Sequence, residues 1–340
     1  MTQSYDVIIV GGGPAGCAAA NYLSKRNVRT LLISKKVAPS VRRSLAVESL
    51  GQEFITNLIE LGLQNVLQGT IIGWYESIEQ FTKACPQGYV RQGAQNCGIH
   101  LDKAKFNANM EEAAKFGGVH FIRDSVNGFQ MTRDWVHGVK TVSGKEYNSA
   151  YVIDATGASH LSANAFKITV INYSPHLVVW TGGANLNSGI AIKNQYNSQF
   201  SFEDNGWSWI AWQSPQQCWW TRLAINGRHD LRPPDCLRGL SLNSAIHVYH
   251  SRWRIFKELA SPGMIRCGDA AGLLDPAAGQ GIKTAILSGM EASKTVMAIL
   301  ADPDCEKTML RKYERWYVRH YLEKIRLLAV AYEQSGIVFQ

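Results

Sequence analysis

Three glycines near the start of the chain have the spacing of a phosphate-binding turn. Gly11, Gly13 and Gly16 fit the pattern G-x-G-x-x-G, and Pro14 and Ala15 fill the positions between them. In such a pattern the first glycine allows a tight turn, the second lets the backbone approach a pyrophosphate, and the third lets helix and strand pack closely. The phosphates then lie at a helix N-terminus, where free N–H groups and the dipole favour negative charge. The five residues therefore predict a dinucleotide site.

The next polar position departs from this pattern. An Asp or Glu about 20 residues further on normally binds the ribose hydroxyls, but here the position is Ser34, followed by Lys35 and Lys36. A serine hydroxyl binds a ribose more weakly than a carboxylate does. Small and basic residues can also accept the 2′-phosphate of NADP, so this region alone leaves NADP open. If the cofactor is FAD, we expect Ser34→Glu to tighten its binding.

A second glycine-rich run, CGDAAGLLDPAAGQGI at residues 267–282, resembles the distant motif of FAD-dependent monooxygenases. In that class the Asp of Gly-Asp binds the ribityl and pyrophosphate part of FAD, and the Asp-Pro passes beside the flavin ring. The Gly-x-Gly-Ile opens a helix whose N–H groups face the pyrimidine end of the ring, where they stabilise negative charge. The resemblance implies FAD as cofactor, bound here also by Asp269, Pro276, Gly279, Gln280, Gly281 and Ile282.

Shorter motifs extend the resemblance. Residues 154–157 (DATG) and 101–107 (LDKAKFN) are similar to segments of the same flavoproteins, and Arg43, or its neighbour Arg42, lies where they carry a basic residue near the cofactor phosphates. Glu48-Ser49-Leu50 resembles the Gly-Glu-Ser-Leu of the halogenase-like branch, with Val47 in place of the glycine. The resemblance implies an α/β fold: a glutathione-reductase-like Rossmann FAD domain, an inserted antiparallel substrate sheet and a C-terminal helix.

Only short motifs indicate which branch of this superfamily the chain resembles. Trp207-Ser208-Trp209 begins like the Trp-x-Trp-x-Ile-Pro of halogenases but lacks the Ile-Pro, and nothing around Lys83 matches their lysine motif. Residues 73–77 (GWYES) and 97–102 (CGIHLD) look like the flavoproteins that mature cysteine tryptophylquinone in amino-acid and amine oxidases. That resemblance implies oxidation of a tryptophan in a precursor polypeptide, with O2 and a reductant. A small-molecule aromatic hydroxylase or halogenase, and a non-catalytic flavin-containing maturation chaperone, remain alternatives.

Catalytic side chains are less evident than cofactor residues. Glu48 and His100 are the candidates for acid–base chemistry, and each could instead be structural. We find no Ser-His-Asp arrangement and no metal-ligand spacing, and we expect no metal.

The apolar pattern shows which elements position these residues. It predicts strands at 6–10 and 30–33, helices at 17–25, 52–61, 103–116 and 281–300, an antiparallel meander over 119–154, and a long helix after Pro303. The aromatic-rich segment 166–255 reads as a separate sheet. We expect an FAD domain from residues 1–72, 98–165 and 258–300, a substrate or partner sheet from 73–97 and 166–257, and a helical tail at 301–340.

Composition excludes several classes of protein. The 340 residues are 46% hydrophobic and 18% charged, which is typical of a globular chain. Seven cysteines without a C-x-x-C pair suit a reducing compartment, and no membrane span or secretion signal is evident, so we expect a cytoplasmic protein. The formal charge of +8 comes without a nucleic-acid motif, so we expect an anionic cofactor or protein partner rather than nucleic acid or membrane.

Overall fold

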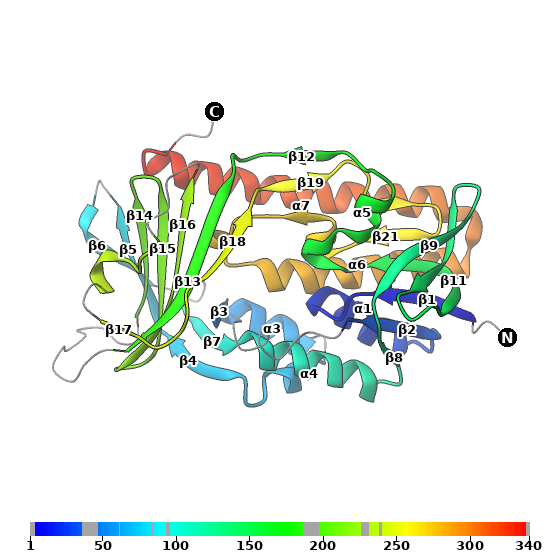
Figure 1. The fold of residues 1–340 in the computed structure, drawn as a ribbon, viewed down its shortest axis with the longest axis horizontal. Helices are drawn as coiled ribbons and strands as arrows, with labels where there is room; N and C mark the ends of the chain where they lie inside the picture. Colours follow the sequence, from blue (N-terminus) through cyan, green and yellow to red (C-terminus); the bar gives the residue numbers. More distant parts are fainter. Residues whose placement is uncertain are drawn as a thin grey trace. The chain divides into compact units, whose positions relative to one another are not determined.

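The computed structural model describes residues 4–35, 47–60, 62–82, 85–92, 96–185, 197–225, 231–237 and 240–337. The chain forms two compact units, coloured along the sequence in Figure 1. Unit 1 contains residues 1–38, 107–173 and 253–325, and unit 2 contains 39–106, 174–252 and 326–340. The α/β fold, with a Rossmann-like domain, further antiparallel sheets and a C-terminal helix, is confirmed. The functional boundaries given above remain a prediction.

Unit 1 is built on a largely parallel sheet with the strand order β20-β21-β11-β1-β2-β8. The apolar runs of β1 and β2 are almost completely buried, as expected of parallel strands covered on both faces. β9 and β10 form a hairpin that pairs antiparallel with β11. The strands are β1 (Ser4–Val10), β2 (Thr30–Ser34), β8 (His120–Arg123), β9 (Val126–Thr132), β10 (Trp135–Thr141), β11 (Glu146–Asp154), β20 (Ala260–Ser261) and β21 (Met264–Arg266).

One strand differs from the predicted meander. β8 pairs in parallel with β2, with Ser34 opposite Arg123. The helix α4 (Lys103–Phe116) precedes β8 and forms a crossover connection, which parallel strands require. Short turns instead connect β9, β10 and β11. The antiparallel meander therefore contains only these three strands.

Two helices of unit 1 pack closely against each other, α1 (Pro14–Ser24) and α6 (Gly281–Ala301), which also lie side by side in Figure 1. The contact needs a glycine, because a Cβ on Gly289 would lie 2.2 Å from the carbonyl oxygen of Ala15. Ser293 donates a hydrogen bond to the carbonyl of Ala19 at 3.3 Å. The remaining elements are α5 (Leu161–Ala165), β12 (Val170–Asn172), β19 (Arg254–Phe256), β22 (Gly272–Leu273) and α7 (Glu306–Gln334), which continues into unit 2.

Unit 2 is dominated by a large sheet with the order β17-β13-β16-β15-β14-β5-β6, and β18 also pairs with β13. Its buried core includes Trp180, Trp212 and Trp220. The predicted antiparallel pairing holds except between β14 and β5, which are parallel. The strands are β5 (Ser77–Thr82), β6 (Cys85–Arg91), β13 (Leu177–Asn185), β14 (Asn197–Glu203), β15 (Gly206–Ser214), β16 (Gln217–Ile225), β17 (Ser241–Leu242) and β18 (His247–Ser251).

A small sheet and one helix complete unit 2. β3 (Val47–Gly51), β7 (Gly98–Asp102) and β4 (Ile71–Tyr75) form an antiparallel sheet with β7 in the middle, and α3 (Gln52–Glu60) follows β3. Within the described ranges, no helix has both the length and the apolar character needed to span a bilayer.

Candidate cofactor site

The first glycine turn separates two kinds of glycine. A Cβ on Gly11, whose φ is +114°, would lie 2.2 Å from the carbonyl oxygen of Ala155, and one on Gly16 would lie 1.9 Å from the carbonyl oxygen of Gly11. A Cβ on Gly13 would meet no described atom within 4 Å. Gly11 and Gly16 are therefore required by packing, whereas Gly13 faces open space.

The same turn begins α1. Gly13 is the N-cap residue, Pro14 opens the helix, and no side chain caps the helix N-terminus. The N–H groups of a helix's first turn have no partner within the helix. Together with the open space at Gly13, they fit the pyrophosphate of a dinucleotide.

The second glycine-rich run builds a similar turn at the start of α6. Gly279 has a φ of +59°, and a Cβ on either Gly279 or Gly281 would meet no described atom within 4 Å. Gln280 is the N-cap residue, without a side-chain cap, and Ile282 is buried beneath it. Unit 1 therefore contains two helix N-termini, those of α1 and α6, that no side chain caps and that border open space. The two helices pack against each other.

The loop before α6 is fixed by buried hydrogen bonds. Asp275 accepts from the backbone N–H of Ala277 at 2.8 Å and from Trp253 Nε1 at 3.0 Å, which holds the turn that contains Pro276. Asp269 lies half-buried in a short 3-10 turn that begins at Gly268. The N–H of Gly268 donates to Ser288 Oγ at 2.9 Å.

Three tyrosines of α7 bind the backbone of this second motif. Tyr313 donates to the carbonyl of Arg266 at 2.6 Å, and Tyr321 donates to that of Leu273 at 3.0 Å. Between them, Tyr317 reaches the carbonyls of Gly268 at 3.0 Å and Gly272 at 3.3 Å. We refer to these residues as the tyrosine series. The spacing of four residues places them on one helix face, which the sequence indicates, but their backbone partners could not be predicted.

A buried charge network lies at the ends of β11 and β21. Asp154 accepts from the N–H groups of Thr156 and Ser162, both at 2.9 Å, and from the Ser162 hydroxyl. Arg266 Nε donates to Ser162 Oγ at 2.8 Å, and Arg266 is completely buried. Burial lowers the pKa of Arg266, and the negative charge of Asp154 opposes that shift. The network fixes the Asp-Ala-Thr-Gly turn beside the first glycine motif.

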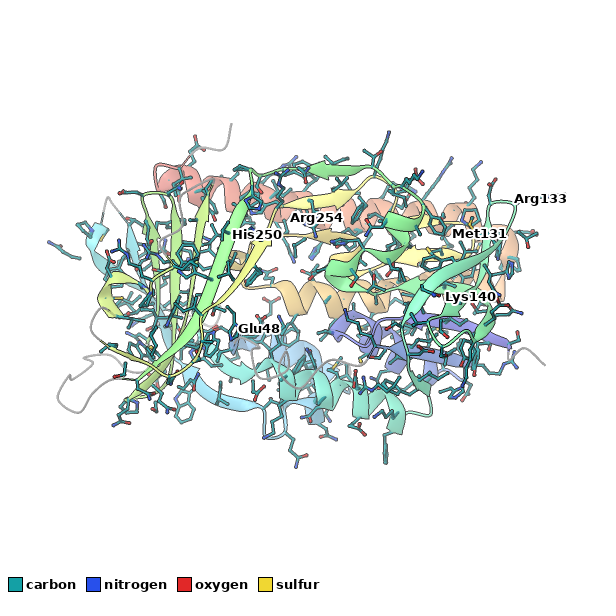
Figure 2. All side chains as sticks on the ribbon, viewed as in Figure 1. Glu48, Met131, Arg133, Lys140, His250 and Arg254 are labelled. Atoms are coloured by element: carbon teal, nitrogen blue, oxygen red, sulfur yellow. The ribbon has the colours of Figure 1, made fainter. Side chains whose placement is uncertain are left out.

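Arg254 and His160 lie near Asp269 in unit 1 (Arg254 is labelled in Figure 2). Burial lowers the pKa of Arg254, and the charge of Asp269 acts in the opposite direction. His160 has a left-handed backbone with φ +44°, and its Nε2 contacts the guanidinium of Arg254. Burial, followed by the charge of Arg254, lowers the pKa of His160 to about 4.

The end of β2 holds contacts that the sequence did not indicate. Ser34 is buried, and its hydroxyl donates to Glu111 Oε1 at 3.0 Å. Arg123 binds both partners, with Nη1 lying 3.1 Å from Ser34 Oγ and 2.8 Å from Glu111 Oε1. Lys35 follows the strand and is exposed. Arg43 lies outside the described residues.

Comparisons with known proteins agree with this geometry. The sequence profile of the family "Glucose inhibited division protein A" matches residues 6–174. A digeranylgeranylglycerophospholipid reductase of Thermoplasma acidophilum is 24% identical, over 92% of this chain and 83% of that protein. The chain is thus similar in sequence to this family and to this reductase, as its glycine motifs lead us to expect of a flavoprotein.

Solved structures share the fold. The flavin-dependent brominase Bmp2 superposes with a TM-score of 0.80 at 18% identity, over 93% of this chain and 84% of that one. The peptidyl tryptophan dihydroxylase QhpG, described as essential for tryptophylquinone cofactor biogenesis, gives a TM-score of 0.70 at 18% identity, over 95% and 74%. The protein is an FAD-dependent oxidoreductase, and the cofactor expected from the second motif is confirmed. The contact of each predicted residue with FAD stays a prediction.

The two catalytic candidates lie in unit 2. His100, on β7, is completely buried, and its Nδ1 and Nε2 lie 2.9 Å from Ser49 Oγ and 3.1 Å from Ser198 Oγ. Trp209 Nε1 donates to Ser49 Oγ at 3.2 Å, and the Tyr75 ring stacks on His100 with centroids 5.0 Å apart. We refer to these five residues as the histidine cluster.

Burial lowers the pKa of His100 to about 4. The ring is therefore neutral at physiological pH, with one nitrogen donating and the other accepting. Glu48, labelled in Figure 2, is partly exposed and forms a 2.5 Å ion pair with Lys103. Acid–base roles for His100 and Glu48 remain predictions.

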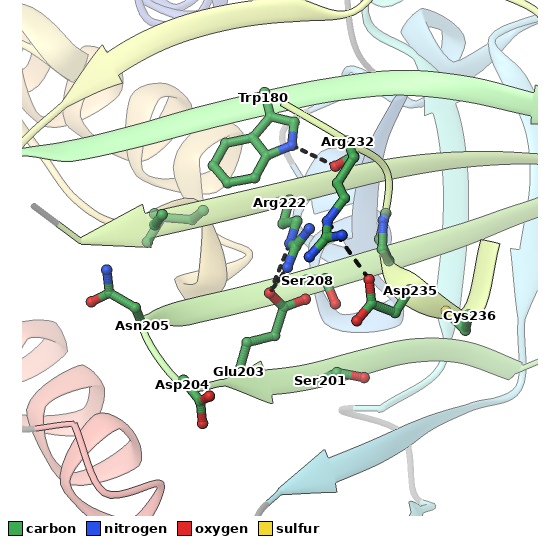
Figure 3. Close-up of a pocket in the computed structure, with 13 residues that line it drawn as sticks. Trp180, Ser201, Glu203, Asp204, Asn205, Ser208, Arg222, Arg232, Asp235 and Cys236 are labelled. Atoms are coloured by element: carbon green, nitrogen blue, oxygen red, sulfur yellow. Dashed lines mark hydrogen bonds and ion pairs between the residues drawn. The ribbon is translucent and has the colours of Figure 1, made fainter. Parts of the chain in front are cut away.

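Unit 2 also contains a cavity of about 620 Å³ against its large sheet, shown in Figure 3. The Trp180 ring and Arg222 line it, and Arg222 Nε donates to Glu203 at 2.7 Å. Arg232 and Asp235 form a second, longer ion pair on its wall, at 3.9 Å. None of the lining residues belongs to the glycine motifs.

Proposed function

We propose that this oxidoreductase inserts oxygen into a tryptophan side chain of a partner polypeptide, the precursor of a tryptophylquinone oxidase. The observation that carries the proposal is the edge of the large sheet in unit 2. Strand β18 pairs with β13 alone among the described strands, and its Val248 and Tyr249 are each 43% exposed. Natural edge strands usually carry lysine, proline or other features that block pairing, and His247–Ser251 contains neither lysine nor proline.

An exposed edge strand is suited to polypeptide binding. An extended segment can add to such an edge through main-chain hydrogen bonds, and apolar side chains give it specificity. A small aromatic substrate would need an enclosed pocket instead. The structural likeness to a peptidyl tryptophan dihydroxylase supports tryptophan as the residue that is modified.

The chemistry requires two electrons from a reductant and one O2 for each oxygen inserted. One oxygen atom is inserted into a C–H bond of the indole ring, giving a hydroxyl group, and the other leaves as water after taking up two protons and the two electrons. Reduced FAD supplies oxygen activation when bound, and the protein contributes orientation and exclusion of water. The seven cysteines are all free thiols, which supports a reducing compartment such as the cytoplasm.

The test is co-expression of a tryptophylquinone-oxidase precursor with this protein, followed by peptide mass spectrometry of the precursor. We expect added oxygen on one tryptophan. Asp269→Ala should remove most of it, because losing a charged acceptor costs about 1–3 kcal/mol of FAD binding and yields a folded but largely colourless protein. Asp304→Ala is the matched control, since Asp304 is an exposed acid in another 3-10 turn of unit 1.

A second candidate function is reduction of isoprenoid double bonds, favoured by the likeness to digeranylgeranylglycerophospholipid reductase. Purified, reduced protein that saturates prenyl chains of such a lipid and leaves the precursor unmodified would replace the first proposal with this one. Tightly coupled hydroxylation or halogenation of free tryptophan would favour a small-molecule enzyme. Precursor maturation that survives Asp269→Ala would favour a chaperone.

A further inference from the structure

The strand that normally carries the ribose-binding acid ends in Ser34, yet a carboxylate lies beside it. Glu111 comes from α4, 77 residues further along the chain, and its Oε1 accepts from Ser34 Oγ at 3.0 Å. Its side chain is only 13% exposed. Both residues belong to unit 1, which also contains the two glycine turns.

The Glu111 carboxylate lies next to the first glycine turn. A Cβ built on Gly12 would lie 2.8 Å from Glu111 Oε1 and 2.3 Å from Ser34 Oγ. Glu111 therefore borders the backbone that approaches the cofactor pyrophosphate. A ribose attached to that pyrophosphate extends toward the end of β2, where Ser34 and Glu111 meet.

Arg123 holds the carboxylate in place. Its Nη1 donates to Glu111 Oε1 at 2.8 Å, and its Nη2 forms an ion pair with Oε2. The guanidinium also lies over the Phe121 ring, 4.6 Å from its centroid. An ionised carboxylate accepts about four hydrogen bonds, so the donors from Ser34 and Arg123 leave capacity for a ribose hydroxyl.

We propose that Glu111 binds the adenosine ribose hydroxyls of FAD in place of the acid missing at position 34, and that Arg123 orients it. The small side chain of Ser34 leaves room for the longer one arriving from α4. The proposal rests on FAD as cofactor and not on the tryptophan substrate, so the two can fail separately. It also reverses the expectation from the sequence that Ser34→Glu tightens FAD.

The first experiment titrates apoprotein with FAD and follows flavin fluorescence. Charged hydrogen bonds contribute enough that Glu111→Gln should weaken FAD binding about tenfold or more. Glu112→Gln is the matched control on the same helix, because Glu112 is 69% exposed and pairs with Lys115. Melting of the apoprotein is measured in parallel. Equal affinity in the two variants, or a loss of apoprotein stability that accounts for the whole change, overturns the proposal.

The second experiment moves the carboxylate. Ser34→Glu alone should weaken FAD binding, because a second carboxylate then faces Glu111. Adding Glu111→Gln to Ser34→Glu should recover affinity to within a fewfold of the wild type. Tighter binding by Ser34→Glu alone, or no recovery in the double variant, overturns the proposal.

A third measurement needs no variant. The wild-type apoprotein should bind FAD about tenfold more tightly than an FAD analogue lacking the adenosine 2′-hydroxyl, as expected for one charge-assisted hydrogen bond. Glu111→Gln should lose most of this preference, while Glu112→Gln should keep it. NADPH that competes with FAD and binds more tightly to Glu111→Gln than to wild type would instead identify a 2′-phosphate site and overturn the proposal.

Discussion

Units 1 and 2 both bury polar side chains, but these side chains contact different partners. In unit 1 the tyrosine series binds backbone carbonyls of residues 266–273, and Asp154 binds the backbone that follows β11. In unit 2 the histidine cluster consists of side chains that bind one another. The tyrosine series and Asp154 therefore fix the path of the chain around the glycine motifs, whereas the histidine cluster fixes the positions of aromatic rings.

The largest effect should come from the charge network of unit 1. Asp154→Ala removes the negative charge that acts most strongly on the buried Arg266, and leaving a buried charge uncompensated costs about 3–5 kcal/mol of unfolding free energy. Urea denaturation of the apoprotein measures it. Asp134→Ala, at an exposed turn, should change stability by less than about 0.5 kcal/mol. A similar small change for Asp154→Ala would contradict the role given to the network.

Acid should test the two units against each other, because His160 in unit 1 and His100 in unit 2 both have a pKa that burial lowers. The pKa values of His100 and His160 both fall to about 4, so the unfolded chain binds more protons between pH 6.5 and 4. Stability contributed by each ring is thus present above pH 6.5 and lost as the pH falls toward 4. For the fully buried His100 we expect a loss of roughly 2–3 kcal/mol.

The measurement is denaturation at several pH values for His100→Gln and His160→Gln. His100→Gln should flatten the acid-induced loss more than His160→Gln, because His160 is only half-buried. If His100→Gln leaves the slope unchanged, the histidine cluster is not a neutral buried network.

The smallest effect should come from one hydroxyl of the tyrosine series. Tyr317→Phe removes the donor to two buried carbonyls while keeping the ring, so we expect a loss of about 1–2 kcal/mol in unfolding free energy. FAD affinity should fall as well, because the loop with Asp269 is less well fixed. Tyr89→Phe, at an exposed position of β6, is the control. Loss of stability without any change in FAD affinity would separate the series from cofactor binding.

The sequence predicts features that belong to consecutive residues. Both glycine turns could be predicted because each glycine's role depends on its neighbours, and the long helices follow from their apolar spacing. Glu111 could not be assigned in this way, because its partner Ser34 is 77 residues away and nothing local marks one glutamate of α4. The sequence offers one indication: because position 34 lacks the usual acid, another residue must bind the ribose hydroxyls if they are bound by a carboxylate.

Contacts between side chains and backbone groups that are distant in the sequence could not be predicted either. The spacing of Tyr313, Tyr317 and Tyr321 indicates a common face, but a buried apolar surface would produce the same pattern. The hydroxyl partners depend on where the loop at 266–273 passes, which only the fold determines. The same applies to His100, whose two serine partners lie on different strands, β3 and β14.

The tyrosine series has a consequence for the order in which the protein matures. A ribosome makes the first glycine turn early, and domains generally begin to fold during synthesis. The second turn is held by hydroxyls from α7, which emerge only after α6 is complete. The nascent chain therefore passes through a stage in which one half of the cofactor cradle exists and the other lacks its supports. We therefore expect flavin to bind late, after α7 has docked, and flavin colour in a purified sample to report that docking.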